Sequence, residues 1–266
     1  MRVPTGLWSG PSLALFALLV PTPAKAGPWT MAKGDGRVIV SAIYSHAGES
    51  YDASGEARQA PDYDQYQAYF QTEFGITDDL TLLFTPSLRR VTVEQGDDST
   101  GLGYTEIGAR YKLIDKDGFV VSLQGSGFIP GVRRRDVVAQ IGSTDPQYDA
   151  RAQAGYGFKI GKLDGFVSAE GGYRYRAGDQ PNEVNGDFTL GLHATKRLMF
   201  IGNSFNTWSD GRGGGIFPSY RYSNIYAGGV YDLTDRVSLQ LGGLATVSGR
   251  NALRERGVYT GLWFKF

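Results

Sequence analysis

The sequence predicts an all-β chain that is exported and closes into an antiparallel transmembrane β-barrel. Three observations predict this fold: an apolar leader at the N-terminus, an alternation of apolar and polar residues with period two, and an aromatic residue at the last position. A period of two is the side-chain repeat of a β-strand, because successive side chains point to opposite faces. A helical membrane protein is excluded, because no apolar run approaches the roughly 20 residues of a spanning helix.

The first 26 residues have the pattern of a secretory signal peptide. Arg2 supplies a positive charge, residues 13–20 form an apolar stretch, and Ala24 and Ala26 frame a small-x-small cleavage site. We therefore expect a signal peptide over 1–26 and a β-barrel over 27–266. The alternative, a soluble protein with an apolar first helix, is disfavoured because nothing after Ala26 has helical periodicity.

The composition excludes several classes of function. The chain has no cysteine and two histidines, so it offers no thiolate or zinc ligand set, and we expect neither a metal nor a cofactor. Its 27 basic and 27 acidic residues balance, whereas nucleic-acid-binding proteins carry a basic surplus. We therefore expect no nucleic-acid partner.

Alternation with period two recurs along the chain. Five segments show it: 105–113, 149–160, 187–195, 237–247 and 258–266. In the last of them Val258, Leu262 and Phe264 share one face, and Tyr259 and Trp263 share the other. These segments of 9–12 residues match tilted membrane strands, whereas strands of soluble sheets average about 5–6 residues.

Short and long connections alternate between these segments. The short turns are predicted at 77–79, 115–118, 162–165, 196–197 and 234–236. The longer polar connections are predicted at 52–63, 96–102, 131–146, 178–185, 210–219 and 249–255. Five turns and six loops join twelve strands, with both chain ends on the short-turn side, as a single-chain outer-membrane barrel requires. The long loops then face outside the cell.

The C-terminal strand ends on Phe266, with Phe264 two positions before it. This ending resembles the signal read by the outer-membrane assembly machinery, which makes that machinery an expected partner. The resemblance implies a location in the bacterial outer membrane, with the lipid bilayer and lipopolysaccharide as further partners. The run Arg133–Arg135 in a predicted loop offers guanidinium groups for lipopolysaccharide phosphates, with a plain solvated charge cluster as the alternative.

Placing the apolar residues outward sends polar side chains to the barrel interior. The predicted lumen-facing residues are Gln71, Glu73, Glu106, Arg110, Lys112, Gln124, Arg151, Lys159, Glu170, Arg174, Arg176 and His193. Basic residues outnumber acidic ones in this set, so an open pore would mildly prefer anions. Twelve strands lie between a barrel filled by side chains and one with an aqueous channel, so the sequence leaves open whether the lumen conducts or is plugged.

The sequence contains no recognisable set of catalytic residues. An acyl hydrolase needs a serine beside a histidine. Ser223-Asn224 resembles half of such a motif, but Arg221 stands where a histidine would help, and His193 is the remaining candidate base. We expect no enzyme, and a lipid-modifying barrel is the least favoured interpretation.

Several short motifs resemble a known group of barrels. These motifs are Gly27-Pro28-Trp29-Thr30, Gly34-Asp35-Gly36, Tyr51-Asp52 with Gly55, and the turn Phe74-Gly75-Ile76-Thr77-Asp78. On these residues the chain resembles the outer-membrane transporters grouped with the meta-pathway phenol-degradation proteins, and more narrowly the XagA-like proteins. The resemblance implies a channel or facilitated-diffusion protein for small hydrophobic or aromatic solutes, and it supplies no catalytic residues. The alternative is a closed barrel whose loops bind exopolysaccharide or lipopolysaccharide.

Deleting Phe266 should impair insertion, because the terminal aromatic is the expected assembly signal. We expect less folded barrel in outer-membrane fractions, measured by heat-modifiable mobility on gels. A deletion variant that folds as well as the parent would show that the terminal aromatic is incidental.

Overall fold

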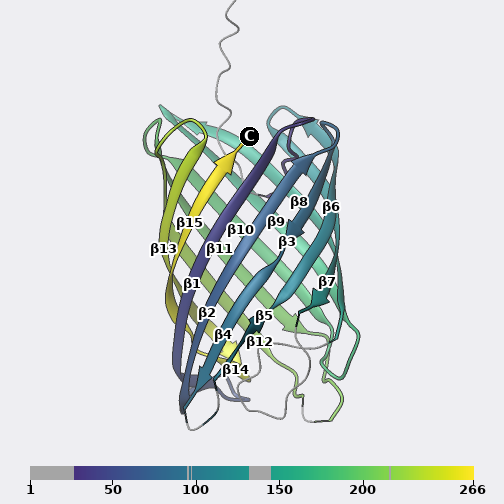
Figure 1. Cartoon of the computed structure of the whole chain (residues 1–266), viewed down its shortest axis with the longest axis vertical. Coiled ribbons are helices and arrows are strands. Elements are labelled where there is room, and N and C mark those ends of the chain that lie inside the picture. Colours follow the sequence, from purple (N-terminus) through teal and green to yellow (C-terminus); the bar gives the residue numbers. More distant parts are fainter. Residues whose placement is uncertain (1–26, 95, 97, 132–144, 216) are drawn as a thin grey trace, which may run out of the picture.

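The segments of period two form fifteen β-strand segments, which the computed structural model joins into one antiparallel sheet (Figure 1). The structure describes residues 27–266 except 95, 97, 132–144 and 216. The expected signal peptide over 1–26 and the run Arg133–Arg135 therefore lie outside the described residues. The segments are β1 (Gly36–Tyr51), β2 (Ala57–Gly75), β3 (Leu80–Thr85), β4 (Ser87–Val93), β5 (Ser99–Leu102), β6 (Tyr104–Lys116), β7 (Phe119–Pro130), β8 (Gln147–Ile160), β9 (Leu163–Arg176), β10 (Glu183–His193), β11 (Leu198–Ser209), β12 (Arg221–Asp232), β13 (Val237–Arg250), β14 (Ala252–Leu253) and β15 (Arg256–Lys265).

Three of the barrel strands are interrupted. Pro86, which has no N–H to donate, separates β3 from β4, and Gly103 separates β5 from β6. Arg254 and Glu255 separate β14 from β15. Counting each interrupted strand once gives a closed barrel of twelve strands, which confirms the predicted fold class. The five short turns lie where they were predicted, at the end marked C in Figure 1.

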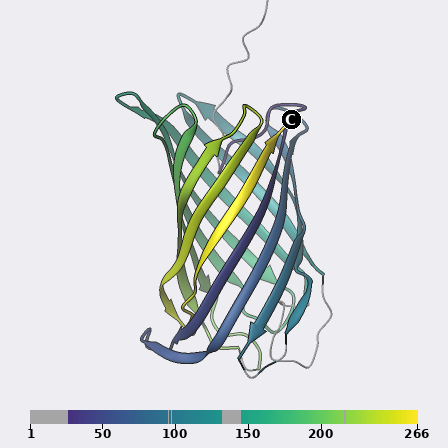
Figure 2. The same cartoon turned by 60° about the vertical axis from the view of Figure 1, so that its left-hand side comes forward.

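The sheet closes through β1. This strand pairs with β2 on one side and with β15 on the other, in a register that runs from Arg37–Lys265 to His46–Arg256. Gly36 and Phe266 exchange two backbone hydrogen bonds, of 2.8 and 3.0 Å. Figure 2 shows the resulting barrel with its strands tilted in one sense. Closure removes the sheet edge, so each strand amide finds a partner inside the protein.

The two faces of the sheet are reversed relative to those of a soluble protein. Large apolar side chains such as Phe188, Leu190 and Leu241 point outward and are more than half exposed. Arg110 and Asp187 point inward and are less than one-tenth exposed. An apolar outer wall around a polar interior suits a barrel that is surrounded by lipid. Within the described ranges, no helix is long and apolar enough to cross a membrane.

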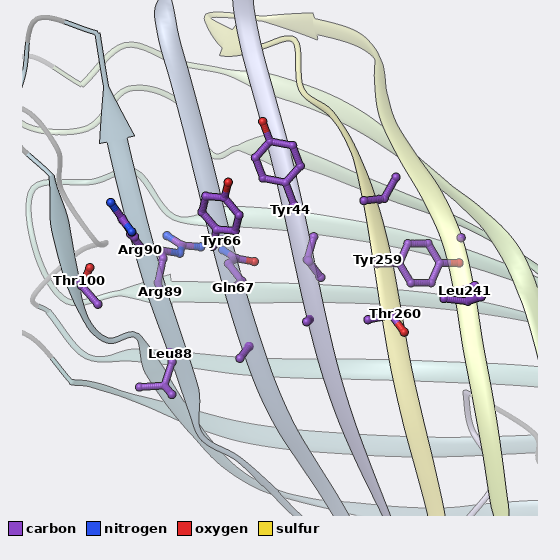
Figure 3. A pocket seen from close by; sticks show the side chains of 15 residues that line it. Tyr44, Tyr66, Gln67, Leu88, Arg89, Arg90, Thr100, Leu241, Tyr259 and Thr260 are labelled. Atoms are coloured by element: carbon purple, nitrogen blue, oxygen red, sulfur yellow. The ribbon is translucent and has the colours of Figure 1, made fainter.

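The outer wall is hollowed by a groove of about 740 Å³ over β1, β2, β4, β13 and β15 (Figure 3). Tyr44 and Tyr66 line it on the long-loop side, with ring centroids 4.8 Å apart. The other outward side chains of the lining include Ala42, Ala68, Leu88, Leu241, Val258 and Thr260. We expect acyl chains of the membrane to fill this groove, because its lining is apolar and faces the lipid.

The first long loop is shorter than predicted. The sequence predicted a loop over 52–63, but β2 begins at Ala57 and the loop spans only 52–56. The prediction was wrong because 57–63 has polar residues on both faces, which hides the period of the strand. Hydrogen bonds from Ser54 and Arg58 to the Asp52 carboxylate brace the turn and hold the pKa of Asp52 well below its usual range.

Replacing Leu241 by arginine should destabilise the barrel by roughly 2–4 kcal/mol if the site lies near the bilayer midplane. The matched control, Gln240→Arg, changes the neighbouring inward side chain and should cost less, because a one-residue step reverses the face. Urea unfolding in lipid vesicles measures both. Equal losses would show that the register of β13 is wrong.

Candidate functional site

The segment before β1 runs inside the barrel at its short-turn end. The Thr30 hydroxyl donates to the Asp78 carbonyl (2.7 Å), and the Met31 amide donates to the Thr81 hydroxyl (2.8 Å). Farther in, the Ser122 hydroxyl donates to the Pro28 carbonyl. The Arg110 guanidinium donates to the Trp29 carbonyl over 3.1 Å. Residues 27–31 therefore run along the inner wall from the β2–β3 turn past β3 and β6 to β7.

Trp29 anchors this segment in an apolar cluster. Its ring meets Phe166 edge-on, with centroids 5.4 Å apart, and Pro28 is fully buried. The cluster consists of the inward residues Ile39, Phe166, Met199, Ile201, Val230 and Trp263. Gly155 provides room for the segment, because a Cβ atom there would lie 2.6 Å from the Trp29 ring and 2.7 Å from Pro28 Cγ. Residues 27–31, called the plug below, thus pack with this cluster inside the barrel near the short turns.

A buried carboxylate supports the plug from the wall. Glu73 accepts from Arg37 and, over 3.2 Å, from Arg110, and all three side chains are at least nine-tenths buried. Arg110 also donates to Gln124, at 3.0 and 3.2 Å. Arg110, which donates to the Trp29 carbonyl, is therefore held by three further hydrogen bonds. A guanidinium with several acceptors in a dry site is held in one orientation.

Ion pairs continue along the inner wall from β8 to β10. Arg151 lies 2.7 Å from both Asp149 and Asp187, and 3.7 Å from Glu170. Arg174 pairs with Asp149 at 3.1 Å. A further pair, Arg176–Glu183, spans 2.9 Å. The network lies on one side of the interior. Strands β8 and β9 carry both basic and acidic side chains, and β10 contributes Glu183 and Asp187.

The neighbouring part of the inner wall, on β11, β12 and β15, is aromatic. Tyr226 of β12 meets Phe205 of β11 edge-on at 5.3 Å and Tyr259 of β15 at 5.5 Å. Tyr259 lies against Gly242, where a Cβ atom would be 2.4 Å from its ring. Phe205 faces inward beside Asp187, yet it is 38% exposed, so the lumen beyond the plug is open at this point. The interior therefore has one charged wall and one aromatic wall.

The structure places the predicted lumen residues in two groups. Glu73, Arg110, Arg151, Glu170, Arg174 and Arg176 belong to the ion pairs above, and Glu106 accepts from Ser126. Lys112 and Lys159 lie at the short-turn end, where Lys112 pairs with Asp79 and Asp115 and Lys159 pairs with Asp164. Gln71 lies on the inward face and is exposed. The lumen-facing residues predicted from the sequence did not include Arg37, Asp149, Glu183 and Asp187, nor the residues of the aromatic wall.

These additions correct the predicted surplus of positive charge. Every lysine and arginine in the predicted set lies within 4 Å of a carboxylate. The period of the strands did not reveal the acidic partners on neighbouring strands. The expected anion preference therefore loses its main support.

The residues considered for hydrolysis are not brought together. Ser223 lies near the long-loop end of β12 and pairs with Ser248, whereas His193 ends β10 at the short-turn end. His193 Nε2 is buried without a hydrogen-bond partner among the described residues, in a pocket that it shares with Phe158 and Asp164. No group of three histidine or acidic side chains positioned to hold a metal ion occurs in the described part of the chain.

Comparison with known proteins identifies the fold. No protein-family model matches the sequence, and no curated relative does. Among solved structures, the COG4313 outer membrane channel of Pseudomonas putida F1 superposes with a TM-score of 0.73 at 15% identity, over 90% of this chain and 98% of that one. The NanC porin gives 0.54 at 10% identity, over 86% and 100%.

A third structure, the translocator domain of the autotransporter NalP from Neisseria meningitidis, gives a TM-score of 0.52 at 9% identity, over 89% of this chain and 90% of that one. Identities this low show a shared fold alone. The chain has the fold of bacterial outer-membrane β-barrels.

Replacing Glu73 by glutamine should destabilise the barrel strongly, because it removes the buried carboxylate that Arg37 and Arg110 share. Breaking a buried ion pair in this way costs about 3–5 kcal/mol. The control Glu56→Gln removes an exposed pair with Arg58 and should leave the unfolding midpoint unchanged. A heat-modifiability series in detergent measures both, and equal midpoints would contradict the buried network.

Proposed function

We propose that this protein is an outer-membrane channel for small hydrophobic or aromatic solutes, and that residues 27–31 occlude it. The observation that carries the proposal is the position of the Pro28 and Trp29 carbonyls, which Ser122 and Arg110 hold inside the lumen. A lumen blocked by such a short segment opens when that segment moves, without any change in the barrel wall.

The solute class follows from the aromatic wall. Phe205 and Tyr226 lie along one side of the interior, and the buried Tyr259 packs against Tyr226. Aromatic rings favour apolar and aromatic solutes through burial and offset stacking. The resemblance to the meta-pathway phenol-degradation and XagA-like proteins favours the same solutes, and the P. putida structure is that of a channel. Membership of the XagA-like group stays a prediction.

The segment is held weakly enough to be released. The hydrogen bond from Ser122 contributes roughly 1 kcal/mol in net terms, and the charge-assisted bond from Arg110 contributes roughly 1.5–3 kcal/mol. Burial of the Trp29 ring contributes about 1.5–3 kcal/mol more. These sums are small beside the many ladder hydrogen bonds of the wall, so the plug leaves before the barrel opens.

Displacing the segment should raise conductance. Gly155→Val places methyl groups where Trp29 and Pro28 now lie, so residues 27–31 should leave the lumen. The matched control is Gly171→Val, since nothing lies within 4 Å of a Cβ atom there. Planar-bilayer recording of the refolded proteins measures single-channel conductance, which should exceed that of the parent only in the Gly155 variant.

The solute class is tested by measuring how fast solutes enter liposomes that contain the same refolded proteins. We expect phenol to enter faster than a sugar of similar size, and the difference to persist in the Gly155 variant. Absence of conductance above the lipid background in both variants would contradict the channel. The closed barrel with saccharide-binding loops would then be favoured.

A further inference from the structure

Two arginines stand side by side on the outer wall, just beyond its apolar band. Arg221 of β12 and Arg250 of β13 are directly paired in the ladder, and both side chains are exposed. Like charges directly opposite each other on one face destabilise a sheet. Neither side chain forms an ion pair or hydrogen bond with any other described residue. Three other arginines at this end, Arg58, Arg90 and Arg254, each pair with a carboxylate, whereas the exposed Arg256 forms no ion pair with a described residue.

Along β12 and β13, the outward side chains change from apolar to hydroxyl-bearing to charged toward the long-loop end. Nearer the short-turn end lie the outward apolar residues Ile225 and Val247, both exposed. The next ladder position holds the cross-strand pair Ser223 and Ser248. The arginines follow one position farther out on the same face. Acyl chain, hydroxyl-bearing sugar and phosphate follow one another in the same order through an outer leaflet built of phosphorylated saccharolipid.

Aromatic residues extend this row around the barrel. Trp208 pairs with Arg221 across β11 and β12, and Val184 and then Tyr173 continue the row on β10 and β9. Trp208 and Tyr173 are each 42% exposed, as rings at headgroup depth are. The nearby acidic side chain, Asp210, accepts a hydrogen bond of 2.8 Å from the Tyr173 hydroxyl on the side away from Arg250.

We propose that Arg221 and Arg250 form a docking site for the phosphorylated headgroup of an outer-leaflet saccharolipid. Two adjacent guanidinium groups offer forked donors to phosphate oxygens, and the bound phosphate removes the repulsion between them. The serine pair contacts the sugar hydroxyls, and Ile225 and Val247 contact the first methylenes of the acyl chains. The site is independent of conduction, because it lies on the outer wall.

The test is native mass spectrometry of the full-length refolded barrel in mixed micelles containing diphosphoryl lipid A. The Arg221→Gln/Arg250→Gln variant should retain this lipid roughly thirty-fold less well, at the scale of two arginines near an anionic surface. The control Arg212→Gln/Arg236→Gln removes two exposed arginines elsewhere and should retain it like the parent. Heat-modifiable mobility confirms that all variants are folded.

Two further measurements distinguish a lipid headgroup from free phosphate as the ligand. Dephosphorylated lipid A should be retained equally weakly by the parent and the Arg221/Arg250 variant. Inorganic phosphate at millimolar concentration should fail to displace the lipid, and displacement would overturn a headgroup site in favour of free phosphate. Equal retention of diphosphoryl lipid A by the parent and the Arg221/Arg250 variant would also overturn the proposal.

Discussion

Closure of the sheet by β1 is the constraint on which the rest of the structure depends. A strand in lipid has no water to satisfy its amides, so the seam from Arg37–Lys265 to His46–Arg256 has to form for the wall to exist. Once the wall is closed, each side chain of a strand points either outward or inward. Outward side chains meet lipid, and inward ones share a confined space, where Glu73, Asp149 and Asp187 each need a cationic partner.

The sequence predicts the wall well because period two is a local property. Alternation around Leu241 or Phe188 can be read without knowing which strand lies next to it. The twelve strands, the short turns and the inward faces of Arg110 and Arg151 follow from this alone. The ion pairs between inward side chains cannot be predicted in this way, because they depend on the register between strands far apart in sequence. Asp187 therefore gains its role only when β8 and β10 are placed around β9.

The plug could not be predicted from periodicity, since residues 27–31 have none. An irregular segment finds its place by matching donors and cavities that exist only in the folded barrel, here the Arg110 guanidinium and the space above Gly155. The polar lumen that the sequence did predict supplies these donors. A charge network that is costly to bury thus also provides an attachment point for the segment before β1.

The length of the first hairpin has a consequence for what the cell exterior meets. β1 and β2 have 16 and 19 residues, and the polar part of β2 from Ala57 onward carries their turn beyond the apolar band. The turn is braced by the Asp52 carboxylate and by Gly55 with a φ of 90°. Antibodies and bacteriophages would therefore meet a rigid, hydrogen-bonded hairpin turn, which suits it to be an epitope. The same turn would serve as a fixed site for displaying a grafted peptide.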